Sequence, residues 1–103
     1  MTELTHENFR TEAEMANRPV LIDFFSHDCS PCKAMGVVFD GLEKQFDSRC
    51  KFCKVNVDQQ EGLAKQFRIL SVPTLILLNN GEVVQRIRGF HSKQDIQKIL
   101  NLS

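Results

Sequence analysis

The first half of the chain alternates strand-like and helix-like patterns of hydrophobic residues. Residues 20 to 25, Val-Leu-Ile-Asp-Phe-Phe, are a continuous β-prone run, which is typical of a strand buried on both faces of a parallel sheet. A second β-prone segment covers residues 51 to 57. Between them a helix is predicted from Pro31 to about Asp47, because apolar side chains recur at helical spacing at Met35, Val38, Phe39, Leu42 and Phe46. This strand, helix, strand order implies a right-handed crossover between parallel neighbouring strands.

Two shorter helices are expected outside this unit. Thr5 is placed to cap the first, which ends near Pro19 and turns an apolar stripe inward at Phe9, Ala13 and Ala16. The second follows the strand at residues 51 to 57, with Asp58 as its expected cap and inward side chains at Leu63, Ala64 and Phe67. A short strand at residues 2 to 4 is left open, so the sheet is expected to have four or five strands.

The second half of the chain predicts an antiparallel hairpin followed by a helix. Strands at residues 75 to 78 and 83 to 88 are joined by Asn79-Asn80-Gly81, and Asn-Gly readily adopts the positive φ angles of a tight hairpin turn. Ser92-Lys93-Gln94-Asp95 resembles a capping box, which predicts a last helix with Ile96, Ile99 and Leu100 turned inward. A parallel unit followed by an antiparallel pair predicts a mixed sheet.

The length and charge of the chain narrow its class. At 103 residues it has the length of a single domain, which we expect to span residues 1–103. Lysine and arginine number 13, as do aspartate and glutamate, so no excess charge favours nucleic acid or an anionic membrane as a partner. Residues 1 to 10 lack the pattern of a signal peptide, and no apolar run is long enough to span a bilayer. A cytoplasmic protein is therefore expected, in which the 4 cysteines favour catalytic or metal roles over structural disulfides.

The candidate chemistry is concentrated in Cys29-Ser30-Pro31-Cys32, between the first buried strand and its helix. Free N–H groups and the dipole at a helix N-terminus favour a thiolate on the first sulfur. A second sulfur one turn inside the helix is close enough to resolve a mixed disulfide. Zinc ribbons use the same spacing, so this pair alone can either close a disulfide or share a metal.

A zinc site gains some support from a second C-x2-C, Cys50 to Cys53, which extends the pattern to C-x2-C-x17-C-x2-C. Side chains three apart in a strand point to opposite faces, and this pair starts its strand at the end of the sheet opposite to Cys29 and Cys32. Four sulfurs about 2.3 Å from one ion are then out of reach, and we expect neither a metal nor an organic cofactor. Cys53 is expected in the core, and Cys50 is expected to be partly exposed and idle rather than regulatory.

In the order of its elements and motifs, the chain resembles the thioredoxin family over nearly its whole length. The motifs that carry the likeness are Val20-Leu-Ile-Asp-Phe-Phe, Cys29-Ser-Pro-Cys-Lys33, Lys54-Val-Asn-Val-Asp58, Val72-Pro-Thr74, Asn80-Gly-Glu82 and Gly89. Each motif is weak alone, but together they follow the order and spacing of the family. The resemblance implies a thioredoxin-like α/β fold, with a central mixed sheet of four or five strands flanked by helices on both faces. It also implies a thiol-disulfide oxidoreductase that reduces protein disulfides.

The resemblance further implies roles for individual residues. Cys29 would be the attacking thiol and Cys32 the resolving thiol, while Asp23 would assist proton transfer at Cys32, with Lys54 beside it. Pro73 would have a cis peptide bond and pack against the disulfide. Contacts to substrate would come from Phe25, Asp28, Ser30, Pro31, Val72, Thr74 and Gly89. The expected partners are disulfide-containing proteins and a recycling reductase, and the protein is expected to be a monomer.

Asp23 also needs an explanation on physical grounds, because a charge inside a buried strand costs several kcal/mol unless it is paired or protonated. If Asp23 is buried, desolvation should raise its pKa towards the range of a general base, and Lys54 should limit the rise. A structural ion pair between Asp23 and Lys54 is the alternative, and both explanations can hold together.

The sequence departs from the family at positions that tune the cysteine pair. Asp28 and Ser30 stand where family members usually have Trp and Gly, and Phe25 replaces a second active-site Trp. Asp28 should disfavour acidic targets and raise the pKa of the Cys29 thiol by less than about half a unit, for charges about 7 Å apart near water. Ser30 would either donate a hydrogen bond to the thiolate or cap a helix that starts at Pro31. Because these positions differ from the family, the alternative is that the protein keeps the fold as a binding or scaffold module and has lost catalysis.

Overall fold

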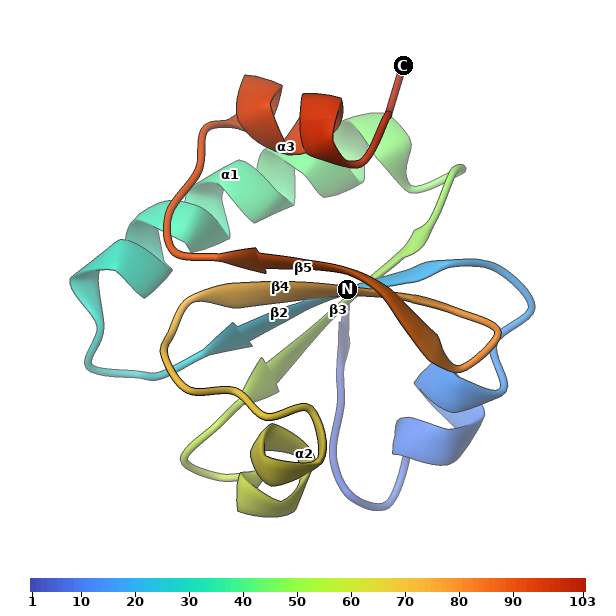
Figure 1. Ribbon diagram of the computed structural model, residues 1–103, viewed down its shortest axis with the longest axis vertical. Helices are drawn as coiled ribbons and strands as arrows, with labels where there is room; N and C mark the ends of the chain where they lie inside the picture. Colours follow the sequence, from blue (N-terminus) through green and yellow to red (C-terminus); the bar gives the residue numbers. More distant parts are fainter.

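Five strands form one mixed sheet in the computed structural model, which describes residues 1–103 (Figure 1). The strands lie side by side in the order β1-β3-β2-β4-β5. Their bounds are Thr2–Glu3 for β1, Val20–Phe25 for β2, Lys51–Asn56 for β3, Thr74–Asn79 for β4 and Glu82–Arg88 for β5. β3 is parallel to β1 and β2, whereas β4 is antiparallel to β2 and β5. The mixed α/β sheet expected from the sequence is confirmed.

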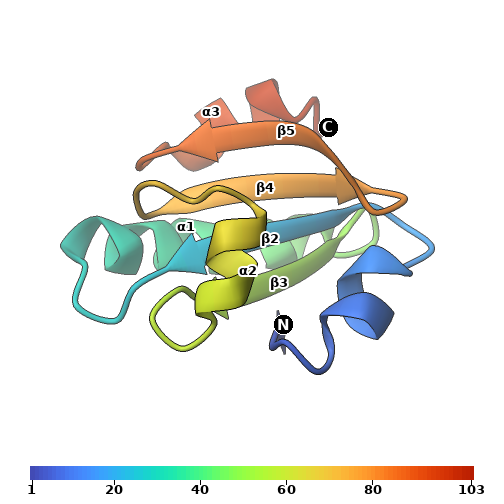
Figure 2. The ribbon, with the colours of Figure 1, turned by 60° about the horizontal axis from the view of Figure 1, so that its bottom comes forward.

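Helices cover both faces of this sheet (Figures 1 and 2). α1 (Ser30–Phe46) and α3 (Lys93–Ile99) lie on one face. α2 (Glu61–Gln66) and a π-helical segment, η1 (Arg10–Glu14), lie on the other. No helix in the structure combines the length and the apolar character needed to cross a membrane.

The alternation of side chains along β2 divides the apolar residues into two cores. Ile22 and Phe24 belong to the core beneath α2 and η1, where the ring of Phe24 lies 5.6 Å from that of Phe67. Leu21 belongs to the other core, which packs against α1 and α3. Asp23 lies two residues after Leu21 in the same strand and therefore shares the α1 face of the sheet.

The hairpin between β4 and β5 forms as predicted. Asn80 and Gly81 both adopt positive φ angles, 54° and 80°, which suit the tight turn that joins two twisted strands. Ser92 caps α3, since its Oγ accepts a hydrogen bond from the backbone N–H of Asp95 at 3.1 Å. Ile96 is fully buried, but Ile99 is 40% exposed, so the predicted inward position of Ile99 is wrong. Ile99 is the last residue of this short helix, one position away from the face that Ile96 shares with residue 100.

The N-terminal helix differs from the prediction in its winding. The capping position of the segment is Phe9, which makes no side-chain capping bond, so the predicted Thr5 cap is wrong. Thr5 instead closes the preceding turn, where its Oγ1 accepts from the N–H of Asn8 and its own N–H donates to the Asn8 side chain. The segment that follows is a π-helix, with a bond from the Met15 N–H to the carbonyl of residue 10. The carbonyl of Glu12, in the last turn of the segment, accepts a hydrogen bond from the ammonium group of Lys51 at 2.7 Å.

The expected cap of α2 is also wrong. The capping position is Gln60, and the side chain of Asp58 instead accepts a hydrogen bond from the Ser26 hydroxyl at 2.7 Å. The side chain of Asn56 organises this turn by accepting from the backbone N–H groups of Asp58 and Gln59. Asp58 therefore connects the loop after β2 to the loop after β3.

Replacing Gly81 with Ala should destabilise the protein by about 1 to 2 kcal/mol, because a Cβ disfavours the left-handed backbone at φ 80°. That Cβ would also lie 3.3 Å from the carbonyl oxygen of Glu14. Gly41→Ala is the matched control: it lies in α1 with open space around the new Cβ, and should stabilise the protein by up to about 1 kcal/mol. Urea unfolding measures both changes, and effects of equal sign would contradict this account.

Candidate active site

The cysteine pair occupies the turn between β2 and α1. Cys29 and Cys32 form a disulfide, with their Cα atoms 5.2 Å apart. Cys29 is the capping residue of α1, and its sulfur accepts a hydrogen bond from the N–H of Cys32 at 3.2 Å. The Cys29 sulfur therefore lies where free N–H groups and the helix dipole stabilise a negative charge.

The two sulfurs differ in access. Cys29 is partly exposed, whereas Cys32 is only 5% exposed and lies one turn inside the helix. Ser30 is the first residue of α1 and is exposed, so the suggestion that Ser30 caps a helix starting at Pro31 is wrong. Ser30 does not cap the helix because the sulfur of Cys29 already accepts the capping hydrogen bond. An incoming sulfur can thus approach Cys29 more readily than Cys32.

The loop before β4 lies against the disulfide. The Val72–Pro73 peptide bond is cis, as the sequence resemblance implies, and Pro73 is buried. The carbonyl oxygen of Val72 lies 3.9 Å from the sulfur of Cys29. The carbonyl of Pro73 accepts a hydrogen bond from the N–H of Gly89 at 2.8 Å, and Gly89 has a positive φ of 83°. The buried hydroxyl of Thr74 donates to the carbonyl of residue 71 and so fixes the same loop.

Asp23 is buried on the α1 face of the sheet, where it is 5% exposed. Its pKa is raised from 3.8 to about 7, chiefly because burial disfavours the charged carboxylate. The positive charge of Lys54 lowers this pKa and the negative charge of Asp40 raises it further. The expected rise, limited by Lys54, is confirmed.

Lys54 is the register partner of Asp23 on β3. The two do not form a close ion pair: the ion pairs of the structure join Glu43 to the N-terminal ammonium group and Glu12 to Lys51. The ammonium group of Lys54 lies instead over the ring of Phe25, 6.0 Å from its centroid. An ion pair therefore does not explain why Asp23 is tolerated here.

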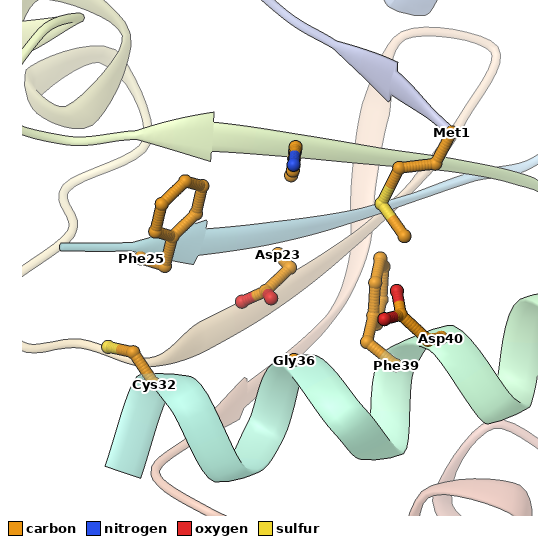
Figure 3. Close-up of a pocket in the computed structure, with 8 residues that line it drawn as sticks. Met1, Asp23, Phe25, Cys32, Gly36, Phe39 and Asp40 are labelled. Atoms are coloured by element: carbon orange, nitrogen blue, oxygen red, sulfur yellow. The ribbon is translucent and has the colours of Figure 1, made fainter. Parts of the chain in front are cut away.

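A cavity of about 170 Å³ lies between α1 and the sheet (Figure 3). It brings together residues predicted from the sequence with others that were not. Its lining consists of Met1, Asp23, Phe25, Cys32, Gly36, Phe39, Asp40 and Lys54. The sequence signal for the additional helical residues is their spacing, because Gly36 and Asp40 follow Cys32 at intervals of four and lie on the same side of α1.

The second cysteine pair is divided between the two cores. Cys50 packs in the core beneath α1 and α3, whereas Cys53 packs in the core beneath α2 and η1. The two thiols therefore cannot chelate one ion with Cys29 and Cys32, and no cluster of three or more metal-binding side chains is present. Cys53 is a core residue as predicted. Cys50 is only 3% exposed, so its predicted partial exposure is wrong; side chains from the C-terminal segment, Leu100 and Leu102, pack beside it.

Comparisons with known proteins agree with this geometry. The family model described as Thioredoxin matches residues 1–102. The chain is 35% identical to the thioredoxin of Haemophilus influenzae, over 98% of this chain and 97% of that protein. It is also 35% identical to the thioredoxin of Bacillus subtilis, over 86% of each chain, and 34% identical to that of Chlorobaculum thiosulfatiphilum, over 93% of this chain and 89% of that protein.

Replacing Asp23 with Asn should stabilise the protein at alkaline pH. The folded protein holds the Asp23 proton up to a pKa of about 7, whereas the ordinary value is 3.8. The unfolded state binds fewer protons between these values, so the free energy of unfolding of the unaltered protein falls as pH rises through this window. A shift of roughly three pKa units corresponds to about 4 kcal/mol. Asp23→Asn should therefore gain on the order of that amount near pH 8, and little near pH 4.

Urea unfolding at the two pH values measures this gain. Asp47→Asn is the matched control, because it makes the same chemical change at an exposed position at the end of α1. An equal gain from both variants, or a gain from Asp23→Asn that does not change with pH, would contradict the burial of an ionisable carboxyl group.

Proposed function

Because the chain belongs to the thioredoxin family and is a thiol-disulfide oxidoreductase that reduces protein disulfides, we propose that Cys29 is its attacking sulfur and Cys32 its resolving sulfur. The observation that carries this assignment is the difference in access between the two. Cys29 is partly exposed at the N-terminus of α1, whereas Cys32 is buried beside Asp23 in the cavity. A nucleophile needs both access and a stabilised thiolate, and only Cys29 has both.

The reaction balances as a transfer of two electrons. The thiolate of Cys29 attacks one sulfur of the substrate disulfide and forms an intermolecular S–S bond, and the other substrate sulfur leaves as a thiolate that takes a proton from water. Cys32 then loses its proton and attacks the sulfur of Cys29. This step releases the second substrate sulfur, which is protonated in turn, and leaves the Cys29–Cys32 disulfide in the protein.

Asp23 is the proposed acceptor of the Cys32 proton, and Lys54 tunes it. A base works best when its pKa lies near the working pH, and burial brings the pKa of Asp23 to about 7. In the reverse step, when a reductase opens the Cys29–Cys32 disulfide, the protonated carboxyl group can return the proton to Cys32. A pKa near neutrality serves both directions, which a freely exposed carboxyl group would not do.

The substrate segment is proposed to bind beside Cys29, along the loop that contains Val72 and Pro73. The carbonyl of Val72 lies next to the Cys29 sulfur, and an extended peptide could pair with this backbone. Gly89 presents no side chain on the adjoining loop, which leaves room for a partner. The remaining proposed contacts are Phe25, Asp28, Ser30, Pro31 and Thr74; Thr74, being buried, would act by holding the loop.

The protein is further proposed to act as a monomer of one domain in the cytoplasm, as an electron carrier that a reductase recycles. A reducing compartment fits a chain whose one disulfide lies at the site and which has no structural disulfide elsewhere. The family relationship supports the reductase, and the neutral net charge gives no reason to expect nucleic acid or a membrane as partner.

Cys29→Ser should abolish the dithiol-dependent reduction of a disulfide-containing protein. Cys32→Ser should stop after the first step and accumulate a covalent mixed disulfide with the substrate, since no resolving thiol is left. Turnover assays and mass spectrometry measure these outcomes. Cys50→Ala is the control and should retain activity. Metal analysis of the same samples tests the zinc alternative. Stoichiometric zinc in the unaltered protein that is lost in all three variants would contradict the proposal.

Asp28→Asn should increase the rate with acidic substrates relative to basic ones by about sevenfold, because a substrate charge about 7 Å away interacts with Asp28 by roughly 0.6 kcal/mol and the effect has opposite sign for the two substrates. Asp28→Trp should add apolar contact area and raise the rate for both. Values of kcat/KM for two peptides that differ only in charge beside the disulfide measure the ratio. A ratio that is the same in Asp28→Asn and the unaltered protein would refute a role of Asp28 in docking.

A further inference from the structure

The cavity beneath the disulfide contains a second acidic residue that the mechanism above does not use. Asp40 lies on α1, two turns beyond Cys32, and lines the same cavity as Asp23. We propose that Asp40 is a positioning residue that increases the proton affinity of Asp23, and that Gly36 keeps open the cavity through which Asp23 exchanges its proton with water. This inference rests on the proposed role of Asp23 as the proton acceptor of Cys32.

The first support is the position of the Asp23 carboxyl group. Figure 3 shows it in the space between β2 and α1, with Cys32 towards one end and Asp40 towards the other. One oxygen of Asp23, Oδ1, is buried and has no hydrogen-bond partner in the protein. A buried carboxyl oxygen without a partner is strongly disfavoured unless water reaches it. The cavity of about 170 Å³ is large enough for water and has polar groups in its wall.

The second support is the set of charges that face Asp23. Lys54 approaches from β3 and Asp40 from α1, while the N-terminal ammonium group at Met1 is paired with Glu43 at 3.5 Å. That pair largely neutralises itself. Asp40 is exposed and takes part in no ion pair and no side-chain hydrogen bond of the structure, so no close partner neutralises its negative charge. The pKa of Asp23 is accordingly raised by Asp40 and lowered by Lys54, in addition to the dominant effect of burial.

The third support is the glycine between them. Gly36 lies in α1, where Ala would favour the helix by about 1 kcal/mol. A Cβ built at Gly36 would meet nothing within 4 Å, so packing does not require glycine. Since Gly36 lines the cavity, a side chain there would occupy its space or its mouth and remove water from Asp23.

The test is the titration of the Asp23 carboxyl carbon by NMR in the full-length oxidised protein. Asp40→Asn should lower the pKa of Asp23, because it removes a like charge, and Gly36→Leu should raise it, because it removes water. Each shift should reach at least about 0.3 unit, a twofold change in proton affinity. The matched controls are Asp47→Asn, at the C-terminal cap of α1, and Gly41→Leu, within α1; both make the same changes outside the cavity and should leave the titration in place. A general disturbance of α1 would shift the titration in the two control variants as well.

The pH dependence of Cys32 attack on a preformed mixed disulfide supplies the kinetic readout. In Asp40→Asn its midpoint should move to lower pH by the same amount as the Asp23 titration. An unchanged Asp23 titration in Asp40→Asn, an equal shift in Asp47→Asn, or no rise in Gly36→Leu would overturn the inference. Failure of the proposed mechanism would look different: Asp23→Asn would leave the kinetic profile unchanged, whereas the NMR shifts in the other variants would still occur.

Discussion

The burial of one ionisable carboxyl group between α1 and the sheet is the constraint on which the rest of the site depends. Because side chains alternate along β2, Ile22 and Phe24 point into the core beneath α2 and η1, whereas Asp23 points towards α1. A register shift of one residue would drive the carboxyl group into the apolar core, so the arrangement fixes the pairing of β2 with its neighbours. The positive charge of Lys54, which lowers the pKa of Asp23 without a close ion pair, and a cavity large enough for water offset part of the cost of burying the carboxyl group.

Features with a strong local cause could be predicted from the sequence. The continuous apolar run of β2 and the helical spacing of α1 each require burial of a particular face, and Asn80-Gly81 satisfies the backbone of a tight turn without outside help. The same logic gave the separation of Cys50 from Cys53, since strand alternation alone places them on opposite faces. The cis bond before Pro73 is different in kind, because only the likeness to a family indicated it.

Features that depend on a partner distant in the chain could not be predicted. The carbonyl of Glu12 in η1 accepts from the ammonium group of Lys51, and the side chain of Asp58 accepts from the hydroxyl of Ser26 instead of capping α2. Cys50 stands at the start of a strand, a position that looks accessible until the C-terminal segment packs beside it. In the sequence, nothing distinguishes Asp40 from other exposed charges on a helix. Only the position of the cavity shows that it shares a lining with Asp23.

One helix links the two halves of the chemistry. The N-terminus of α1 stabilises charge on Cys29, and the stripe at Cys32, Gly36 and Asp40 on the same helix forms a wall of the cavity around Asp23. Because these positions follow one helical repeat, a rotation of α1 that moved the sulfur of Cys32 would also move the charge of Asp40 relative to the buried carboxyl group. In the proposed mechanism, one helix therefore positions both the sulfur that gives up the proton and a charge that acts on the carboxyl group that receives it.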